Sequence, residues 1–240
     1  GLEMKPYKQI LDDGYAGLEM ANEAFSRDLR VKGHAVFWDG NTILDFLSET
    51  GNYQDLSYEE LYRKVVDFVI PNIYSMKGKL AQWDVMNELH SYNYIRNTYN
   101  TTRFYTDIIK LVDQIDPDVK LFVTEAGTMG KDRGMTDRIP TLVKIVKQMK
   151  SEGAPIDGIG LQTHVDQYYY PQGLYRQLDE CSEVVDEVAV TEFDFFHAKK
   201  ENAGKYAGDL LTAAFSHPKC NTFIMQNLSL LRKYFFGKYM

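Results

Sequence analysis

The sequence predicts an α/β fold in which short parallel strands alternate with helices, and three observations lead to that prediction. The 240-residue chain is 44% hydrophobic and 25% charged, as expected for a folded globular protein. Short apolar runs rich in β-branched residues recur along it. The stretches between these runs space their apolar residues as a helix does. Strands and helices that alternate in this way form parallel sheets with crossover helices.

The predicted strands are short runs in which β-branched and aromatic residues dominate. Six runs have this length and composition: 31–38, 82–88, 120–126, 156–164, 188–194 and 222–228. Strand length and composition therefore recur six times along the chain.

The predicted helices fill the stretches between these strands. In 58–74, the residues Leu61, Val65, Phe68 and Val69 fall on one face at helical spacing. The other helices are expected at 7–29, 102–115, 136–152, 173–184 and 202–216. Pro117 marks the end of the third of these six helices, because proline cannot continue a helix and restrains the residue before it.

Two parallel architectures compete, an open doubly wound sheet and a closed barrel. No strand is followed by the glycine-rich phosphate-binding turn of a dinucleotide fold. Polar and reactive residues instead occur near the C-terminal ends of most strands, as in a (β/α)8 barrel. They are His34 and Trp38, Asn87 and Glu88, Glu125, Gln162 and His164, and Glu192 and Asp194. We therefore expect an incomplete (β/α)8 TIM barrel with six recognisable strands, forming a single domain over 1–240.

Composition argues against several classes of partner. The formal net charge is −7, which disfavours nucleic acid or an anionic membrane as the main partner. No run approaches the roughly 18 apolar residues that a membrane-spanning helix needs, and we expect no signal peptide within the chain. Cys181 and Cys220 make neither a disulfide framework nor a zinc site. One bridge or two buried free thiols remain, and the latter is the simpler interpretation.

Glu88 and Glu192 are the two carboxylates that suggest chemistry. Glycosidic bond cleavage uses such a pair, with one carboxyl protonated for the leaving oxygen and one ionised beside the sugar carbon. A glutamate that merely ends a strand in solvent is the simpler explanation for either residue alone. Two of them, each with Asn or Asp nearby and accompanied by aromatic residues and histidines, favour a catalytic pair.

Four motifs in order resemble glycoside hydrolase family 10, the retaining endo-β-1,4-xylanases. They are Lys-Gly-His-Ala-Val-Phe-Trp (32–38), Trp-Asp-Val-Met-Asn-Glu (83–88), Ile-Asp-Gly-Ile-Gly-Leu-Gln-Thr-His (156–164) and Val-Ala-Val-Thr-Glu-Phe-Asp (188–194). The resemblance covers most of the chain. It implies hydrolysis of xylan-type β-1,4-linked plant polysaccharide, without a cofactor and outside the cell.

The resemblance also implies roles for individual residues. Glu88 would be the general acid/base and Glu192 the nucleophile. Asn87 would bind the 2-hydroxyl of the sugar whose bond is cleaved, while His164 and Gln162 would lie beside the nucleophile.

Four further positions receive lesser roles from the same resemblance. Lys5 and His34 would bind hydroxyls of that sugar, Trp38 would pack on its apolar face, and Asp194 would orient its neighbours. Taken alone, His34 and His164 could be buried core histidines, Trp38 core filler and Lys5 an exposed lysine. The histidines could also bind a metal, but metal-dependent barrel hydrolases use a His-x-His pair, and this chain has none.

The chain departs from the family pattern at several places. The family's first two strands are absent, so the edges of the barrel would need cover from another segment or a partner chain. Asp39 stands where the family usually has His, Glu125 and Ala126 fall in a segment that usually reads Asn-Asp-Tyr-Asn, and Gln226 occupies the place of a Trp. These departures leave a second hypothesis open, a weakly active or inactive relative that binds carbohydrate.

Overall fold

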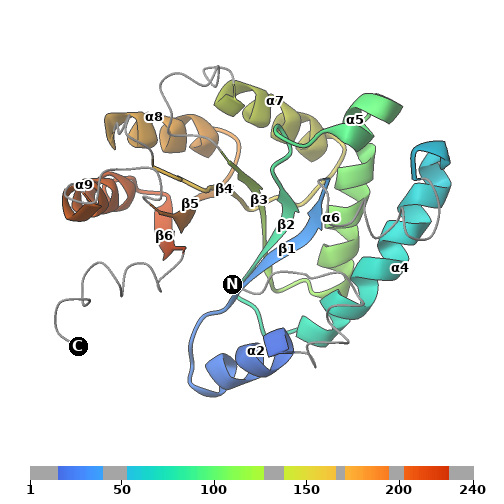
Figure 1. Cartoon of the computed structure of the whole chain (residues 1–240), viewed down its shortest axis with the longest axis horizontal. Coiled ribbons are helices and arrows are strands. Elements are labelled where there is room, and N and C mark those ends of the chain that lie inside the picture. Colours follow the sequence, from blue (N-terminus) through green and yellow to red (C-terminus); the bar gives the residue numbers. More distant parts are fainter. Residues whose placement is uncertain (1–15, 40–52, 127–137, 166–170, 195–202, 227–240) are drawn as a thin grey trace. The chain divides into compact units, whose positions relative to one another are not determined.

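The parallel sheet is confirmed by the computed structural model, which describes residues 16–39, 53–126, 138–165, 171–194 and 203–226 (Figure 1). Its six strands are hydrogen-bonded in sequence order. They are β1 (Lys32–Trp38), β2 (Gln82–Asn87), β3 (Lys120–Glu125), β4 (Gly158–Leu161), β5 (Glu187–Phe193) and β6 (Cys220–Met225). Each overlaps one predicted strand. Within the described residues β1 and β6 stand at the two ends of this order, which agrees with an incomplete barrel.

The helices also fall where the apolar spacing predicts them. They are α2 (Ala16–Ser26), α4 (Tyr58–Met76), α6 (Arg103–Ile115), α7 (Arg138–Ser151), α8 (Pro171–Ser182) and α9 (Ala203–Phe215). A short helix α5 (Tyr94–Tyr99) and a 3-10 turn (Tyr53–Asp55) were not predicted. Residues 7–15 of the first expected helix lie outside the described residues.

The chain divides into two compact units, one formed by Gly1–Val123 with Ile145–Asp157 and the other by Thr124–Lys144 with Gly158–Met240. A single domain over 1–240 therefore stays a prediction, as does the expected cover over the barrel edges. Among the described helices, none combines the length and apolar character that a membrane crossing requires.

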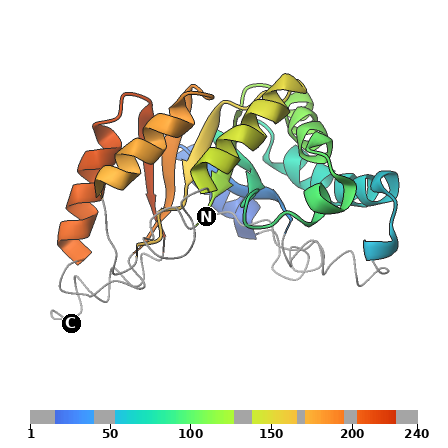
Figure 2. The same cartoon turned by 90° about the horizontal axis from the view of Figure 1, so that it is seen from above.

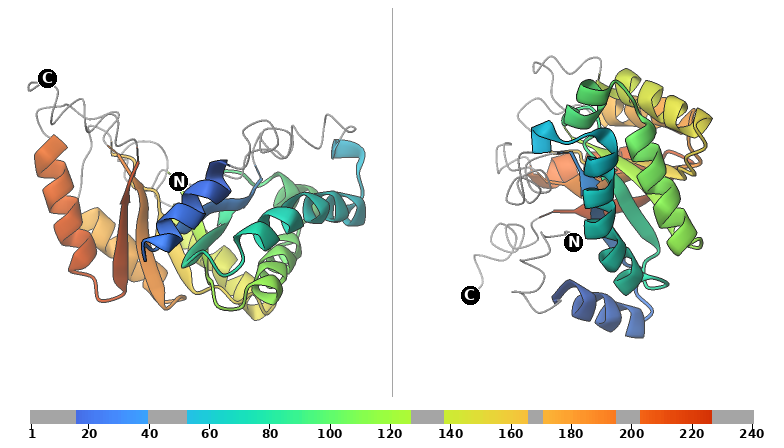
Figure 3. Two further views of the ribbon diagram at one scale, coloured as in Figure 1. Left: turned by 90° about the horizontal axis from the view of Figure 1, so that it is seen from below. Right: turned by 90° about the vertical axis from the view of Figure 1, so that its right-hand side faces the viewer.

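In the first unit, α4 and α6 lie side by side and pack on β1 and β2 (Figures 1 and 3). The N-terminus of α4 is closed by a capping box, in which Ser57 and Glu60 satisfy each other's backbone N–H groups. Gly33 of β1 faces the Trp83 ring of β2 so closely that an added Cβ would lie 2.1 Å from a ring carbon. Glycine is therefore required there by the neighbouring strand.

In the second unit, α8 and α9 pack together beside β5 and β6 (Figure 2). Gly160 of β4 makes a similarly close approach, since an added Cβ would meet the side chains of Thr191 at 2.5 Å and Thr124 at 2.8 Å. Cys181 and Cys220 are buried free thiols, the simpler of the two alternatives left by the sequence.

Candidate active site

In the first unit, the pairing of β1 with β2 places the candidate residues side by side. The two strands are parallel, and their register sets His34 opposite Asp84 and Trp38 opposite Asn87. Parallel pairing brings the C-terminal ends of both strands to the same edge of the sheet. Trp38 and Asn87 therefore lie next to one another, and Glu88 follows directly after Asn87.

Glu88 directly follows the last residue of β2 and has an unusual backbone conformation. All six residues of β2 are buried, but Glu88 is partly exposed and has φ of +56°. Left-handed conformation is uncommon outside glycine and often marks a functional position. The Glu88 carbonyl accepts a 2.8 Å hydrogen bond from the Tyr92 backbone N–H. The Tyr92 ring packs edge-on against Trp38, with ring centroids 5.1 Å apart.

His34 is oriented by a buried carboxylate. Asp84 is 0% exposed, and its Oδ2 accepts from His34 Nδ1 at 2.8 Å and forms an ion pair with Lys32 Nζ. Because an ionised carboxylate only accepts hydrogen bonds, the proton on His34 must sit on Nδ1. This fixes the orientation of the ring, and the Lys32 charge offsets the cost of burying Asp84.

Asp39, the residue that departs from the family pattern, directly follows the last residue of β1 and is buried. Its Oδ2 accepts from the Tyr105 hydroxyl at 2.7 Å and from the Ile95 backbone N–H at 2.8 Å. Asp39 therefore ties the end of β1 to the first turn of α5. Burial raises the pKa of Asp39 from 3.8 to about 6, although the hydrogen bonds and the nearby Arg96 charge act in the opposite direction.

In the second unit, four of the predicted residues gather at the ends of β4 and β5. Gln162 and His164 flank Thr163, whose φ of +61° is unusual for a β-branched residue. His164 Nε2 lies 3.2 Å from Gln162 Oε1 and 3.6 Å from Glu192 Oε2. On the other side of the ring, His164 Nδ1 lies 3.1 Å from Asp194 Oδ2. The imidazole thus bridges two carboxylates.

These contacts set the charge of His164. Burial acts to lower the pKa of His164, but the hydrogen bonds and charges of Asp194 and Glu192 outweigh it and raise that pKa from 6.5 to about 9. His164 is therefore an imidazolium at neutral pH, and its positive charge faces Glu192.

Gln226 joins this group, although the sequence indicated only that an expected Trp was lost there. Its side-chain Nε2 donates to Glu192 Oε2 at 3.1 Å, and its backbone N–H donates to the Phe193 carbonyl at 2.9 Å. No local pattern predicts this contact, because it joins residues 34 positions apart. Pairing of β5 with β6 creates it.

Glu125, which the sequence placed at the end of the third strand, is not an open carboxylate. It is 0% exposed, and its Oε1 lies 3.1 Å from Arg138 Nη1 at the start of α7. The same guanidinium nitrogen donates to the Ala126 carbonyl at 3.0 Å. Glu125 therefore acts in an internal ion pair that joins two segments of the second unit.

The structure thus brings together Trp38 and Asn87 in the first unit, next to Glu88, and Gln162, His164, Glu192 and Asp194 in the second. Glu88 and Glu192 belong to different units, and each is described within its own. Lys5 lies outside the described residues. Within those residues, no group of three or more His, Cys, Asp or Glu side chains is arranged to hold a metal ion.

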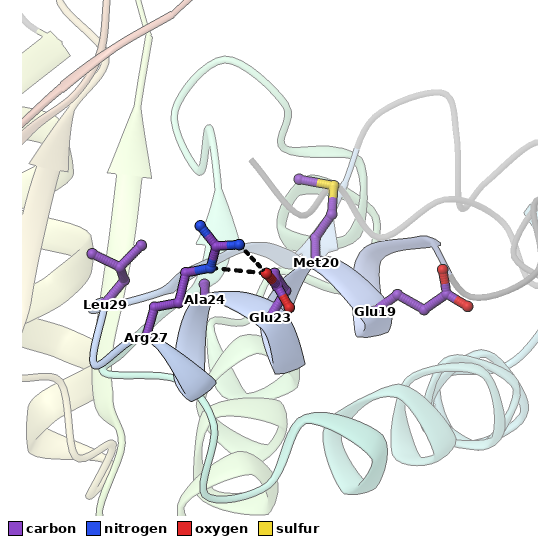
Figure 4. Close-up of a pocket in the computed structure, with 6 residues that line it drawn as sticks. All are labelled: Glu19, Met20, Glu23, Ala24, Arg27 and Leu29. Carbon is purple, nitrogen blue, oxygen red and sulfur yellow. Dashed lines mark hydrogen bonds and ion pairs between the residues drawn. The ribbon is translucent and has the colours of Figure 1, made fainter.

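A pocket on α2 holds none of these candidate residues (Figure 4). It is lined by Glu19, Met20, Glu23, Ala24, Arg27 and Leu29. Arg27 Nε donates to Glu23 Oε1 at 2.8 Å, so two of the three charged residues that line the pocket are paired with each other. We assign no chemistry to it.

Comparison with known proteins shows the family that the chain matches and several named relatives. The sequence profile of Glycosyl hydrolase family 10 matches residues 14–229. Endo-1,4-beta-xylanase 4 of Arabidopsis thaliana is 30% identical over 236 residues, which are 93% of this chain and 39% of the relative. Beta-1,4-xylanase of Dictyoglomus thermophilum is 29% identical over 212 residues, 82% of this chain and 55% of the relative. The chain thus spans about two fifths to about half of these relatives.

Solved structures give the same result for the fold. The GH10 xylanase of Bispora sp. MEY-1, determined with xylobiose, superimposes with a TM-score of 0.71 at 17% identity. The match covers 89% of this chain and 68% of that one. The fold is thus that of the TIM barrels of this group, with part of the barrel represented here.

Proposed function

The chain belongs to glycosyl hydrolase family 10, and on that premise we propose that it hydrolyses the backbone of xylan-type β-1,4-linked polysaccharide at internal bonds. The observation that carries this proposal is the setting of Glu192. This carboxylate stands at a strand end, beside the imidazolium of His164 and the amide of Gln226. An ionised carboxylate held in this way can act as a nucleophile toward a sugar carbon.

The proposed reaction proceeds by two displacements at the anomeric carbon. Glu88 gives its proton to the leaving oxygen while the Glu192 carboxylate attacks that carbon, which breaks the glycosidic bond and forms a glycosyl ester. Glu88 then takes a proton from water as the water attacks the same carbon. This step releases Glu192 as a carboxylate and returns the proton to Glu88.

The remaining candidates hold the sugar and the two carboxyl groups. Asn87, buried beside Glu88, would donate to the 2-hydroxyl, a hydrogen bond that strengthens in the transition state. His34, with its ring fixed by Asp84, and Lys5 would bind hydroxyls of the same sugar, and Trp38 would cover its apolar face. Because the substrate is a polymer too large to enter a cell, we place this activity outside the cell.

Release of reducing ends from xylan by the purified chain tests this function. Glu192→Gln should abolish turnover, because an amide cannot attack the sugar carbon. Glu187→Gln is the matched control, since it makes the same change at the other end of β5 and should leave turnover near that of the unmodified chain. Binding of xylan without turnover would instead support the weakly active or inactive carbohydrate-binding relative.

The role of Glu88 needs a separate comparison of leaving groups. Glu88→Ala should slow xylan hydrolysis by about 10²–10⁴-fold, because the acid no longer assists departure. Aryl xylosides with a good leaving group should lose much less in their first step. Equal loss on both substrates would exclude Glu88 as the acid.

A further inference from the structure

Gln226 is fixed at the end of β6 by two contacts with the same neighbouring strand. Its backbone N–H bonds to the carbonyl of Phe193, and its side chain donates to the carboxylate of Glu192, the preceding residue. In the register of the two strands, Phe193 pairs with Met225, the residue directly before Gln226. The amide therefore reaches Glu192 from a backbone that is already held in place.

The contact has a defined direction. An ionised carboxylate accepts hydrogen bonds and does not donate them, so the side-chain NH₂ of Gln226 must face it. Glu192 Oε2, the oxygen that accepts at 3.1 Å from Gln226, also lies 3.6 Å from His164 Nε2. The hydrogen bond from Gln226 and the positive charge of His164 thus act on one carboxylate oxygen, and the hydrogen bond restricts rotation of the carboxyl group.

Gln226 and His164 differ in how they respond to pH. His164 carries a charge that is lost as pH rises through about 9, whereas a carboxamide does not titrate. Hydrogen bonds to a charged group are stronger than those between neutral partners. Gln226 can therefore hold Glu192 over the whole pH range in which that carboxylate is ionised.

We propose that Gln226 is a positioning residue, which holds the Glu192 carboxylate in the orientation needed for attack in place of the aromatic residue that the family pattern has there. This role rests on the proposed function, in which Glu192 is the nucleophile. Gln226 acts through Glu192. It transfers no proton and forms no covalent bond in the reaction.

The first test compares Gln226→Met with Gln172→Met, which makes the same change at an exposed position of α8. Gln226→Met keeps the length of the side chain and removes the donor. We expect it to lower the kcat for glycosyl-enzyme formation from an activated aryl xylobioside by about 10- to 100-fold, with KM changed by less than about threefold. Gln172→Met should change neither constant.

The second test uses Gln226→Glu and a pH profile. The introduced carboxyl can donate to Glu192 only while it is protonated. Once it is ionised, its negative charge repels the Glu192 carboxylate. The activity of this variant relative to that of the unmodified chain should therefore increase as pH falls. A loss that is independent of pH would contradict a donor role.

Crystal structures of the unmodified chain and of Gln226→Met separate this proposal from the proposed function. The Glu192 carboxylate should turn away from its original orientation in the variant, whether or not the chain hydrolyses xylan. If the unmodified chain is inactive but Glu192 is displaced in Gln226→Met, the proposed function is refuted and the positioning role is supported. An unmoved carboxylate, or kinetics equal to those of Gln172→Met, would overturn the positioning role.

Discussion

Asp39 is a buried carboxyl whose ionisation works against folding. Its pKa is raised from 3.8 to about 6, so between these values the folded chain binds a proton more tightly than the unfolded chain does. Stability therefore falls as pH rises through this window. A difference of about two pKa units corresponds to roughly 3 kcal/mol between the acidic and the neutral limit.

Asp39→Asn should remove this dependence, because a carboxamide oxygen can still accept from Tyr105 and Ile95 without a charge. Denaturant unfolding from pH 4 to pH 7 would measure it. We expect the variant to lose less stability than the unmodified chain across that range, while Asp118→Asn at an exposed position behaves like the unmodified chain. Parallel curves for Asp39→Asn and the unmodified chain would refute the assignment.

His164 should also make stability fall as pH rises, but in a higher pH range. Its folded pKa of about 9 exceeds the ordinary 6.5, so its stabilising contribution is complete below pH 6.5 and is lost as pH rises through about 9. Titration of the imidazole by NMR should give a midpoint near 9. Asp194→Asn should lower this midpoint, because it removes the charge facing Nδ1. A midpoint below 7 in the unmodified chain would contradict the bridge between two carboxylates.

The strands show how close packing decides which residue a position accepts. Gly33→Ala would force a Cβ into the Trp83 ring, and we expect a loss of about 1–3 kcal/mol or more in the free energy of unfolding. Gly208→Ala in α9 is the matched control, because nothing lies within 4 Å of its added Cβ. It should stabilise the chain by about 0.4–1 kcal/mol. Denaturant unfolding of both variants measures the contrast, and equal effects would refute the packing argument.

The elements were predictable wherever local pattern decides them. Buried β-branched runs predicted all six strands, but β4 covers only Gly158–Leu161 of the expected 156–164. The backbone turns at Thr163, whose positive φ ends the regular strand. Helix α5 was missed because its six residues are too few to show helical spacing, and its start is fixed by a distant carboxylate, Asp39.

The sequence indicated the candidate site residues one by one but not the contacts between them. The motifs located Glu88, Glu192, His164 and Asn87 because polar residues at strand ends stand out in the sequence. The contacts at the site join residues far apart in the chain: Glu192 and Gln226 are 34 positions apart, and His34 and Asp84 are 50. Pairing of strands and packing of helices create such contacts, and local sequence carries no signal for them.

At the scale of the whole molecule, the proposed mechanism rests on family membership and on two sets of strand-end residues, each described within its own unit. Asn87 and Glu88 belong to the first unit, and Glu192 belongs to the second, where it lies beside His164 and Gln226. Double displacement needs both carboxyl groups at the same sugar. It inverts the anomeric carbon twice, so the product keeps the configuration of the substrate. The configuration of the product therefore shows whether both carboxyl groups take part as proposed.

Proton NMR of the first products from xylan therefore tests the central claim most directly. The β-anomer of the new reducing end should appear first, and the α-anomer should grow later by mutarotation in solution. Glu192→Gln, recorded under the same conditions, should release neither. Initial appearance of the α-anomer would show a single displacement by water and would contradict the role assigned to Glu192.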